Sequence, residues 1–299
     1  MYNVTDEVPE NTRTAIHSCD GEINLNDLIV RGANVLFVVI DSLRFDIAFQ
    51  EQEAGNTPNI NRYGRWIKCE AAGNFTWPSH HSMFSGFMPK PLEAAPGHSM
   101  LFFPKDIGLG RLGPKNAFAF SEETWIKGLE NKGYRTICVG GVSFFNNRSG
   151  MGKVFPAMFK ESYWYPNFSC TVKESMDNQL TLINKKVNAE QPLMMYINID
   201  TIHYPNHFYI ENAKPGDTVE THAAALHYID ARIEKLFDTF RQTGRETLVI
   251  LCSDHGTCYG EDGKYFHSFN HPIVNTVPYF HFVLGKVRIS RSFLPKLTR

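Results

Sequence analysis

Two carboxylates and one imidazole occur where two apolar stretches of this sequence end. Asp254 and His255 directly follow the apolar run Thr247–Cys252, and Asp41 directly follows the apolar run Asn34–Ile40. An Asp oxygen and a neutral His nitrogen are ligands that one divalent metal ion can share. If both runs are parallel strands, their carboxyl ends meet at one edge of a sheet, where open α/β folds build their sites. The sequence therefore predicts a metal site formed by Asp41, Asp254 and His255.

A segment rich in hydroxyl groups, residues 74–86, has the pattern of a loop that turns into a helix. Pro78 is favoured in a first helical turn, and Thr76 precedes it at or near the cap. Backbone N–H groups and the positive end of the helix dipole would favour an alkoxide there and bind a tetrahedral oxyanion. Thr76 is therefore the candidate nucleophile, Ser79 is the alternative, and His80 could contact substrate. The structural alternatives are a simple N-cap for Thr76 and a helix-surface residue for His80.

Four further residues could join this site. Asp200 and His203 follow the apolar run Leu193–Ile199, and His267 and His271 follow the Asp-His pair in a segment that returns to the sheet. They are candidates for substrate contacts or for a second metal ion. Each is also consistent with an ordinary loop residue.

Arg44 follows Asp41 closely in the chain. This spacing suits a metal site that receives an anion, because the Asp can hold the cation while the Arg orients a neighbouring oxygen. The alternative is a surface turn in which Arg44 pairs with Asp46. Arg44 is therefore a candidate substrate-binding residue.

The elements that must position these residues alternate along the chain. Continuous apolar runs predict strands of a parallel sheet, whereas caps and apolar stripes at spacings of three and four predict helices. Helix caps are expected at Thr57 and Ser121. Strands are expected at residues 34–40, 134–139, 193–199, 247–252 and 277–284, and helices at 57–66, 121–133, 175–187 and 218–242. This alternation predicts an α/β fold with a mostly parallel sheet covered on both faces.

One catalytic domain, residues 34–299, is expected after an N-terminal segment, residues 1–33. Two stretches resist assignment to regular structure. Residues 87–118 contain five prolines, and residues 141–170 are rich in Phe, Tyr, Trp and Asn. Irregular segments of this length are usually lids or binding loops, so we expect these insertion loops to govern the choice of substrate.

The composition excludes several classes of partner. The 299 residues carry a formal net charge of -1, which gives no support for binding to nucleic acid or to a charged membrane surface. No apolar run is long enough to span a bilayer, and the polar N-terminus lacks the pattern of a signal peptide. None of the six Cys lies in a CxxC pair, as expected of reduced thiols. These features predict a cytoplasmic protein without a membrane anchor, in an oligomeric state that the sequence does not specify.

Taken in order, these segments resemble the alkaline phosphatase superfamily, in its sulfatase-like branch, over residues 34–284. Residues 41–46 look like the first metal-acid segment of that superfamily. Residues 57–61 (Thr-Pro-Asn-Ile-Asn) resemble the stretch that follows this segment in sulfatases. Residues 76–79 (Thr-Trp-Pro-Ser) fall where sulfatases carry Cys-x-Pro-Ser-Arg, which puts Thr76 at the nucleophile position.

The second half of the chain continues the resemblance. Residues 203–205 match a His-x-Pro segment that contacts the anionic group of the substrate. Residues 253–256 with residues 260–263 are similar to the distal metal segment. His267 falls where sulfatases place a substrate-binding Lys and some phosphodiesterase relatives a metal-binding His. The resemblance implies an alkaline phosphatase-like three-layer α/β/α sandwich, in a poorly characterised bacterial group of cytosolic sulfatase-like hydrolases.

The departures from the sulfatase pattern change the expected chemistry. Sulfatases convert a Cys or Ser into formylglycine, and Thr76 cannot yield that aldehyde. Ser42 and His80 replace a second acid and an Arg. A threonine nucleophile is instead the pattern of phosphodiesterases, nucleotide pyrophosphatases and phosphoethanolamine transferases in the superfamily. Two-metal members carry an Asp and a His one residue further apart than Asp200 and His203.

Together these residues predict a metal-dependent hydrolase or phosphotransferase that acts on a small anionic phosphate ester, a diester or monoester. The expected reaction passes through a covalent phosphothreonine at Thr76. Asp41, Asp254 and His255 would hold one of one or two divalent ions, with Thr76 completing its shell. Mixed oxygen and nitrogen ligands suit Zn or Mn better than Ca or Mg. The alternatives are sulfate or phosphonate ester hydrolysis on the same residues and, in another class, a non-catalytic, metal-stabilised binding domain.

Overall fold

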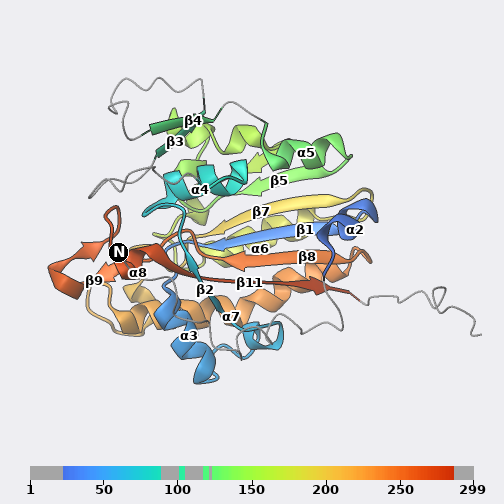
Figure 1. Ribbon diagram of the computed structural model, residues 1–299. Coiled ribbons are helices and arrows are strands. Elements are labelled where there is room, and N and C mark those ends of the chain that lie inside the picture. The colour runs from blue at the N-terminus through green and yellow to red at the C-terminus, as the bar shows by residue number, and fades with distance from the viewer. Residues whose placement is uncertain (1–22, 89–100, 105–116, 121–122, 286–299) are drawn as a thin grey trace, which may run out of the picture.

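A central sheet of seven strands organises the computed structural model, which describes residues 23–88, 101–104, 117–120 and 123–285 (Figure 1). The strand order is β2-β11-β8-β1-β7-β5-β6. The strands of this sheet are β1 (Asn34–Ile40), β2 (Ile67–Glu70), β5 (Arg135–Val139), β6 (Glu161–Tyr163), β7 (Leu193–Ile199), β8 (Thr247–Cys252) and β11 (Thr276–Leu284). The α-helices of the described residues are α2 (Leu25–Val30), α3 (Phe45–Glu53), α4 (Thr76–Ser85), α5 (Trp125–Asn131), α6 (Ser175–Lys186), α7 (Val219–Arg241) and α8 (Pro272–Asn275).

Most of the sheet is parallel. Neighbours from β8 through β1, β7 and β5 to β6 pair in parallel, whereas β11 runs antiparallel to both β8 and β2. Strands β1 and β7 are buried at every position, which explains why both read as continuous apolar runs. The predicted α/β fold with a mostly parallel sheet is confirmed.

Helices cover both faces of the sheet and so form three layers. Alternate residues of a strand point to opposite faces. In β1, Leu36 and Val38 therefore pack in one core with residues of α3, α6 and α7. Val35 and Phe37 pack in the other core with residues of α4 and α5. Helix α7 begins at a capping box in which the side chain of Thr218 accepts the N–H of Thr221.

Two predicted helix starts differ from the structure. The helix expected over residues 57–66 is only a 3-10 turn, Ile60–Arg62, because the Asp230 carboxylate on α7 accepts the N–H of Ile60 and holds the chain in a tight turn. The hydroxyl of Thr57 donates to the Asn61 side chain and so does not cap a helix. Helix α5 is capped by Thr124, and the predicted cap, Ser121, lies outside the described residues.

The stretch expected to be a second insertion loop, residues 141–170, contributes to the core. It holds the edge strand β6, which pairs with β5, together with short 3-10 turns that bury Phe145 and Phe155. In the first stretch, residues 89–100 and 105–116 lie outside the described residues. The described parts are β3 (Leu101–Pro104) and β4 (Ala117–Phe120), which pair in parallel.

Helix α2 precedes the domain boundary predicted at residue 34. The Asn24 side chain accepts the N–H of Asp27 at its start, and Leu28 packs with Leu248 of β8. Residues 1–22 lie outside the described part of the chain. No described helix combines the length and the apolar character that crossing a membrane requires.

Three parallel strands deliver the predicted site residues to one edge. Ile40, at the end of β1, is level with Ile199 of β7, and Val39 is level with Cys252 of β8. The residues that follow all three strands therefore emerge together. In Figure 1 the arrowheads of β1 and β8 point towards the side where β9 (Cys258–Tyr259) lies, and β9 pairs with β10 (Tyr265–Phe266) in a hairpin.

Candidate metal centre and active site

Asp41, Asp254 and His255 converge at the carboxyl edge of the sheet. Each offers a ligand atom, and these atoms all lie within 4.8 Å of one another. His255 Nε2 lies 3.7 Å from Asp41 Oδ1 and 3.5 Å from Asp254 Oδ2. All three side chains are fully buried. The structure thus assembles the predicted trio of side chains.

The imidazole of His255 is oriented by its own backbone. Nδ1 lies 2.9 Å from the carbonyl oxygen of Gly256, so we assign the proton to Nδ1 and the lone pair to Nε2. Burial lowers the pKa of His255 and favours this neutral form. A ligating His commonly has its second nitrogen held in this way.

Asp254 has one satisfied oxygen and one unsatisfied oxygen. Oδ1 accepts the N–H groups of Ser42 (3.1 Å) and His255 (3.0 Å), whereas Oδ2 is buried without a hydrogen-bond partner among the described residues. Burial, reinforced by the neighbouring Asp41, raises the pKa of Asp254. An unpaired buried polar group costs roughly 1–3 kcal/mol, and a charged one costs more. A cation between Asp41 and Asp254 would remove that cost, so the residues present fit a divalent metal ion.

Asp41 is held as a carboxylate. Burial acts to raise its pKa, but His203, His255 and hydrogen bonding outweigh burial and lower it to about 2. Oδ1 accepts the hydroxyl of Ser42 (3.0 Å), and Oδ2 accepts the side-chain amide of Asn198 (3.0 Å). Ser42 adopts a positive φ of 66°, which lets its backbone turn back towards Asp254.

Thr76 is the first residue of α4, and its hydroxyl faces the cluster. Oγ1 lies 3.4 Å from Asp41 Oδ2 and 3.4 Å from His255 Nε2. The N-cap residue is Phe75, which supplies no side-chain hydrogen bond to the helix. Thr76 is therefore not a simple cap, and it lies at a helix N-terminus, a position that suits an anion.

Ser79 and His80 support the site from behind instead of facing a substrate. The hydroxyl of Ser79 donates to the carbonyl of Asp254 (2.8 Å). The imidazole of His80 lies 2.8 Å from the Thr76 carbonyl through Nδ1 and bonds the Tyr196 hydroxyl through Nε2. Burial lowers the pKa of His80 to about 4. The predictions that Ser79 is an alternative nucleophile and that His80 contacts substrate find no support in this buried geometry.

Two of the four additional candidates reach the cluster. The ring of His267 lies 4.4 Å from that of His255 and 5.8 Å from that of His203, measured between centroids. Burial, with help from His255 and His203, lowers the pKa of His267 to about 3 and keeps it neutral. Phe266 and Ser268, on either side of His267, both have positive φ angles, a strained backbone of the kind found at functional sites.

Asp200 and His271 do not join the ligand cluster. Asp200 is buried against Gly141, and burial followed by Asp41 raises its pKa. His271 is the N-cap of α8, where its Nδ1 accepts the N–H of Ile273, and its Nε2 lies 3.1 Å from Asp262. Of the predicted candidates for a second metal ion, His203 and His267 lie near the cluster, whereas Asp200 and His271 do not.

Arg44 pairs with carboxylates of the protein itself. Its guanidinium forms two hydrogen bonds to Asp46 (3.0 and 2.6 Å) and one to Glu261 (2.5 Å), and the side chain is only 4% exposed. These contacts tie the start of α3 to the segment that links β9 and β10. The pairing with Asp46 was expected as the alternative, and the predicted contact with substrate finds no support because the buried guanidinium pairs with two carboxylates of the protein.

Asn198 is a site residue to which the sequence alone assigned no role. Its side chain donates to Asp41, as described above, and its Oδ1 accepts the N–H groups of Val142 (3.0 Å) and Gly141 (3.3 Å). The signal in the sequence was a polar residue inside an otherwise apolar strand. A buried amide in such a strand needs partners, and here one partner is a candidate metal ligand.

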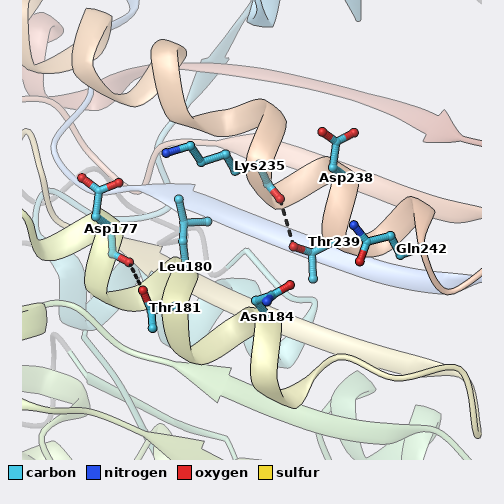
Figure 2. Close-up of a pocket in the computed structure, with 8 residues that line it drawn as sticks. All are labelled: Asp177, Leu180, Thr181, Asn184, Lys235, Asp238, Thr239 and Gln242. Carbon is cyan, nitrogen blue, oxygen red and sulfur yellow. Dashed lines mark hydrogen bonds between the residues drawn. The ribbon is translucent and has the colours of Figure 1, made fainter.

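A separate hollow of about 400 Å³ lies between α6 and α7 (Figure 2). Two of its hydroxyl groups, those of Thr181 and Thr239, donate to carbonyls in the preceding turn of their own helices. It contains none of the predicted site residues. Its lining consists of Asp177, Leu180, Thr181, Asn184, Lys235, Asp238, Thr239 and Gln242.

A family model and a curated protein match this chain. The sulfatase family model matches residues 33–280. The chain is 20% identical over 156 residues to the uncharacterized sulfatase YdeN of Escherichia coli, a match covering 47% of this chain and 25% of that protein. The chain thus matches about a quarter of the length of this curated relative.

Two solved structures share the fold. The periplasmic domain of EcEptC from Escherichia coli, solved in complex with Zn, has a TM-score of 0.57 and 13% identity. That match covers 83% of this chain and 71% of the other. A protein of the alkaline phosphatase superfamily from Vibrio parahaemolyticus has a TM-score of 0.50 and 17% identity over 85% of this chain and 60% of the other. At these identities the likeness concerns the fold.

Proposed function

The chain belongs to the sulfatase family, within the alkaline phosphatase superfamily, and on that basis we propose that it is a metal-dependent phosphate ester hydrolase or phosphotransferase. The reaction passes through a covalent threonine intermediate. The observation that carries this proposal is the Thr76 hydroxyl, which starts α4 and lies 3.4 Å from both Asp41 and His255. A nucleophile beside a metal-ligand cluster and a helix N-terminus is what phosphoryl transfer requires.

One divalent ion would be held by Asp41, Asp254 and His255, with Thr76 completing its shell. Two features support this assignment. Oδ2 of Asp254 has no hydrogen-bond partner among the described residues, and the Nε2 atom of His255, which carries the lone pair, lies near both carboxylates. Two carboxylates and an imidazole favour Zn or Mn over Ca or Mg. When bound, the ion supplies a Lewis acid that lowers the cost of forming the Thr76 alkoxide.

The chemical step transfers the phosphoryl group to Thr76. Oγ1 gives up its proton and forms a bond to phosphorus, while the bond between phosphorus and the ester oxygen breaks. The departing alkoxide takes a proton and leaves as an alcohol. Water or an acceptor hydroxyl then attacks the phosphothreonine, which releases the product and restores the Thr76 hydroxyl. Hydrolysis and transfer differ only in that acceptor.

His203 and His267 bind the anionic group of the substrate. Their rings lie side by side next to the cluster, and His267 is neutral at physiological pH. Imidazole N–H groups can donate to phosphoryl oxygens as negative charge develops on them. If a second ion binds, these two histidines are its ligands, whereas His271 is engaged as a helix cap.

Sulfate or phosphonate esters are the competing substrates, because they present the same tetrahedral anion. Thr76 argues against sulfatase chemistry through formylglycine, since oxidation of a threonine side chain gives a ketone instead of an aldehyde. The expected partner is a small anionic ester in the cytoplasm. The prediction of a cytoplasmic location stays a prediction, and the EcEptC structure is that of a periplasmic domain.

The test compares the hydrolysis of a chromogenic phosphate monoester, a phosphate diester and a sulfate ester, each with Zn or Mn. We expect turnover of at least one phosphate ester, lost in Thr76→Ala while bound metal is retained. Ser79→Ala is the matched control one turn further along α4, and it should retain turnover through Thr76. Full activity in Thr76→Ala would exclude Thr76 as the nucleophile. If the wild type neither binds metal nor turns over any of the esters, the alternative of a non-catalytic binding domain is favoured.

A further inference from the structure

Two exposed aromatic side chains adjoin the histidines of the site. Tyr204 directly follows His203, and Phe266 directly precedes His267. Their side chains remain 55% and 49% exposed. The two rings meet edge to face, with centroids 5.1 Å apart and planes at 75°. We refer to Tyr204 and Phe266 together as the aromatic corner.

The position of the aromatic corner is fixed by the backbone. Phe266 pairs with Cys258 in the β9-β10 hairpin, so it is held on a segment that starts just after the metal ligands. The N–H of Ser268 donates to the carbonyl of Asn74, two residues before Thr76. On the other side, the carbonyl of Tyr204 accepts the thiol of Cys170. These contacts hold both rings at the rim of the site.

The conformation and the exposure of Phe266 both cost folding free energy, and a function in binding would explain why they occur. Its φ of 68° is a genuine outlier for a bulky side chain, and strained residues of this kind cluster at ligand sites. Leaving about half of a large apolar side chain in water forgoes about half of the stabilisation that its full burial would provide. A ligand that covers the ring restores that stabilisation.

The neighbouring aromatic residue shows that exposure alone does not define the corner. Tyr265 is 62% exposed on the same hairpin. The ring of Phe266 meets Tyr204, whereas Tyr265 is oriented towards another part of the hairpin. Its hydroxyl lies 3.2 Å from the place that a Cβ on Gly260 would occupy. Tyr265 is therefore a matched control.

We propose that the aromatic corner binds a planar ring of the ester substrate, while His203 and His267 bind its anionic group. This inference rests on the proposed function, because it assigns the organic part of the same substrate. Rings in edge-to-face contact leave a face open for stacking, and aryl groups and nucleobases both present such a face. The substrate class is therefore an aromatic or heteroaromatic phosphate ester.

The test measures binding, so that it does not depend on turnover. Calorimetric titration of the Zn-loaded protein compares phenylphosphonate with methylphosphonate, which differ only in the ring. Stacking on aromatic side chains should make phenylphosphonate bind roughly tenfold more tightly. Tyr204→Leu and Phe266→Leu should each reduce that ratio towards one, because leucine cannot stack. Tyr265→Leu should leave the ratio unchanged.

A second pair of ligands separates the two sources of the ring. Adenosine 5′-phosphate and ribose 5-phosphate are compared in Thr76→Ala, which prevents turnover. Tighter binding of adenosine 5′-phosphate than of ribose 5-phosphate shows that the corner accepts a nucleobase. If only phenylphosphonate binds more tightly than its partner, the corner requires an aryl group. Equal binding within both pairs overturns the inference and leaves the proposed function intact. Failure of the wild type to bind any of these anions contradicts both.

Discussion

At the scale of single residues, Gly256 shows how little room the metal centre leaves for change. A Cβ at this position would lie 2.1 Å from the carbonyl oxygen of Ile273, and the N–H of Gly256 donates to the carbonyl of Val274 (2.8 Å). Its φ is not positive, so a left-handed backbone conformation does not explain the glycine. The glycine is needed because two backbones approach closely.

Replacement of Gly256 by alanine should therefore disturb the centre. The obstructing atom belongs to the backbone, so the segment carrying Asp254 and His255 must shift. We expect Gly256→Ala to destabilise the protein by about 1–3 kcal/mol and to reduce metal binding. Calorimetric melting and metal analysis measure the two effects. Gly128→Ala in α5 is the control, because a Cβ there meets nothing within 4 Å. Equal melting temperatures for both variants would contradict this account.

The metal-ligand trio was foreseeable, whereas several neighbouring roles were not. Asp41, Asp254 and His255 follow apolar strands, and parallel topology brings strand ends together whatever the loops do. The environment of Arg44 depends on Glu261, which lies 217 residues away in the sequence. That of His80 depends on Tyr196, 116 residues away. Side-chain partners at such separations leave no local pattern to read.

At the scale of elements, the edge strand β6 depends on an ion pair. The guanidinium of Arg135 in β5 contacts both oxygens of Glu161 in β6, and Tyr163 donates its hydroxyl to the same carboxylate. The sequence did not indicate β6, because three residues between irregular turns carry no periodicity. The hydrogen bonds from Arg135 lower the pKa of Glu161 to about 2, more than burial raises it.

The stability supplied by Glu161 should depend on pH in a defined window. Because the pKa is lower in the folded state, the contribution is complete above the ordinary carboxyl pKa and is lost as pH falls towards about 2. We expect Glu161→Gln to melt below the wild type at pH 7, with a difference that narrows between pH 4 and pH 3. Glu211→Gln, at an exposed loop position, should show no such narrowing. A difference independent of pH would exclude the ion pair as its cause.

At the scale of the whole molecule, the centre joins distant parts of the fold. Strands β1 and β8 bring the buried Asp41 and Asp254 together. Thr76 comes from α4, in a helix layer that covers one face of the sheet. Two buried carboxylates repel each other, and removing them from water is costly. The metal-free fold is therefore under electrostatic stress at this edge, and metal binding and folding are coupled.

This coupling predicts that bound metal stabilises the fold and that Asp254→Asn removes this stabilisation. Removal of metal by a chelator should lower the melting temperature, since a ligand at a hundred times its Kd stabilises by about 2.7 kcal/mol. Asp254→Asn should abolish that shift, because the cluster loses an anionic ligand. The metal-free variant should nevertheless melt no lower than the metal-free wild type, because Asp41 no longer faces a second buried carboxyl. The side chain of Asp262 is 81% exposed, so Asp262→Asn is the matched control. It should keep the metal-dependent shift in melting temperature. A shift that persists in Asp254→Asn would show that the ion binds elsewhere.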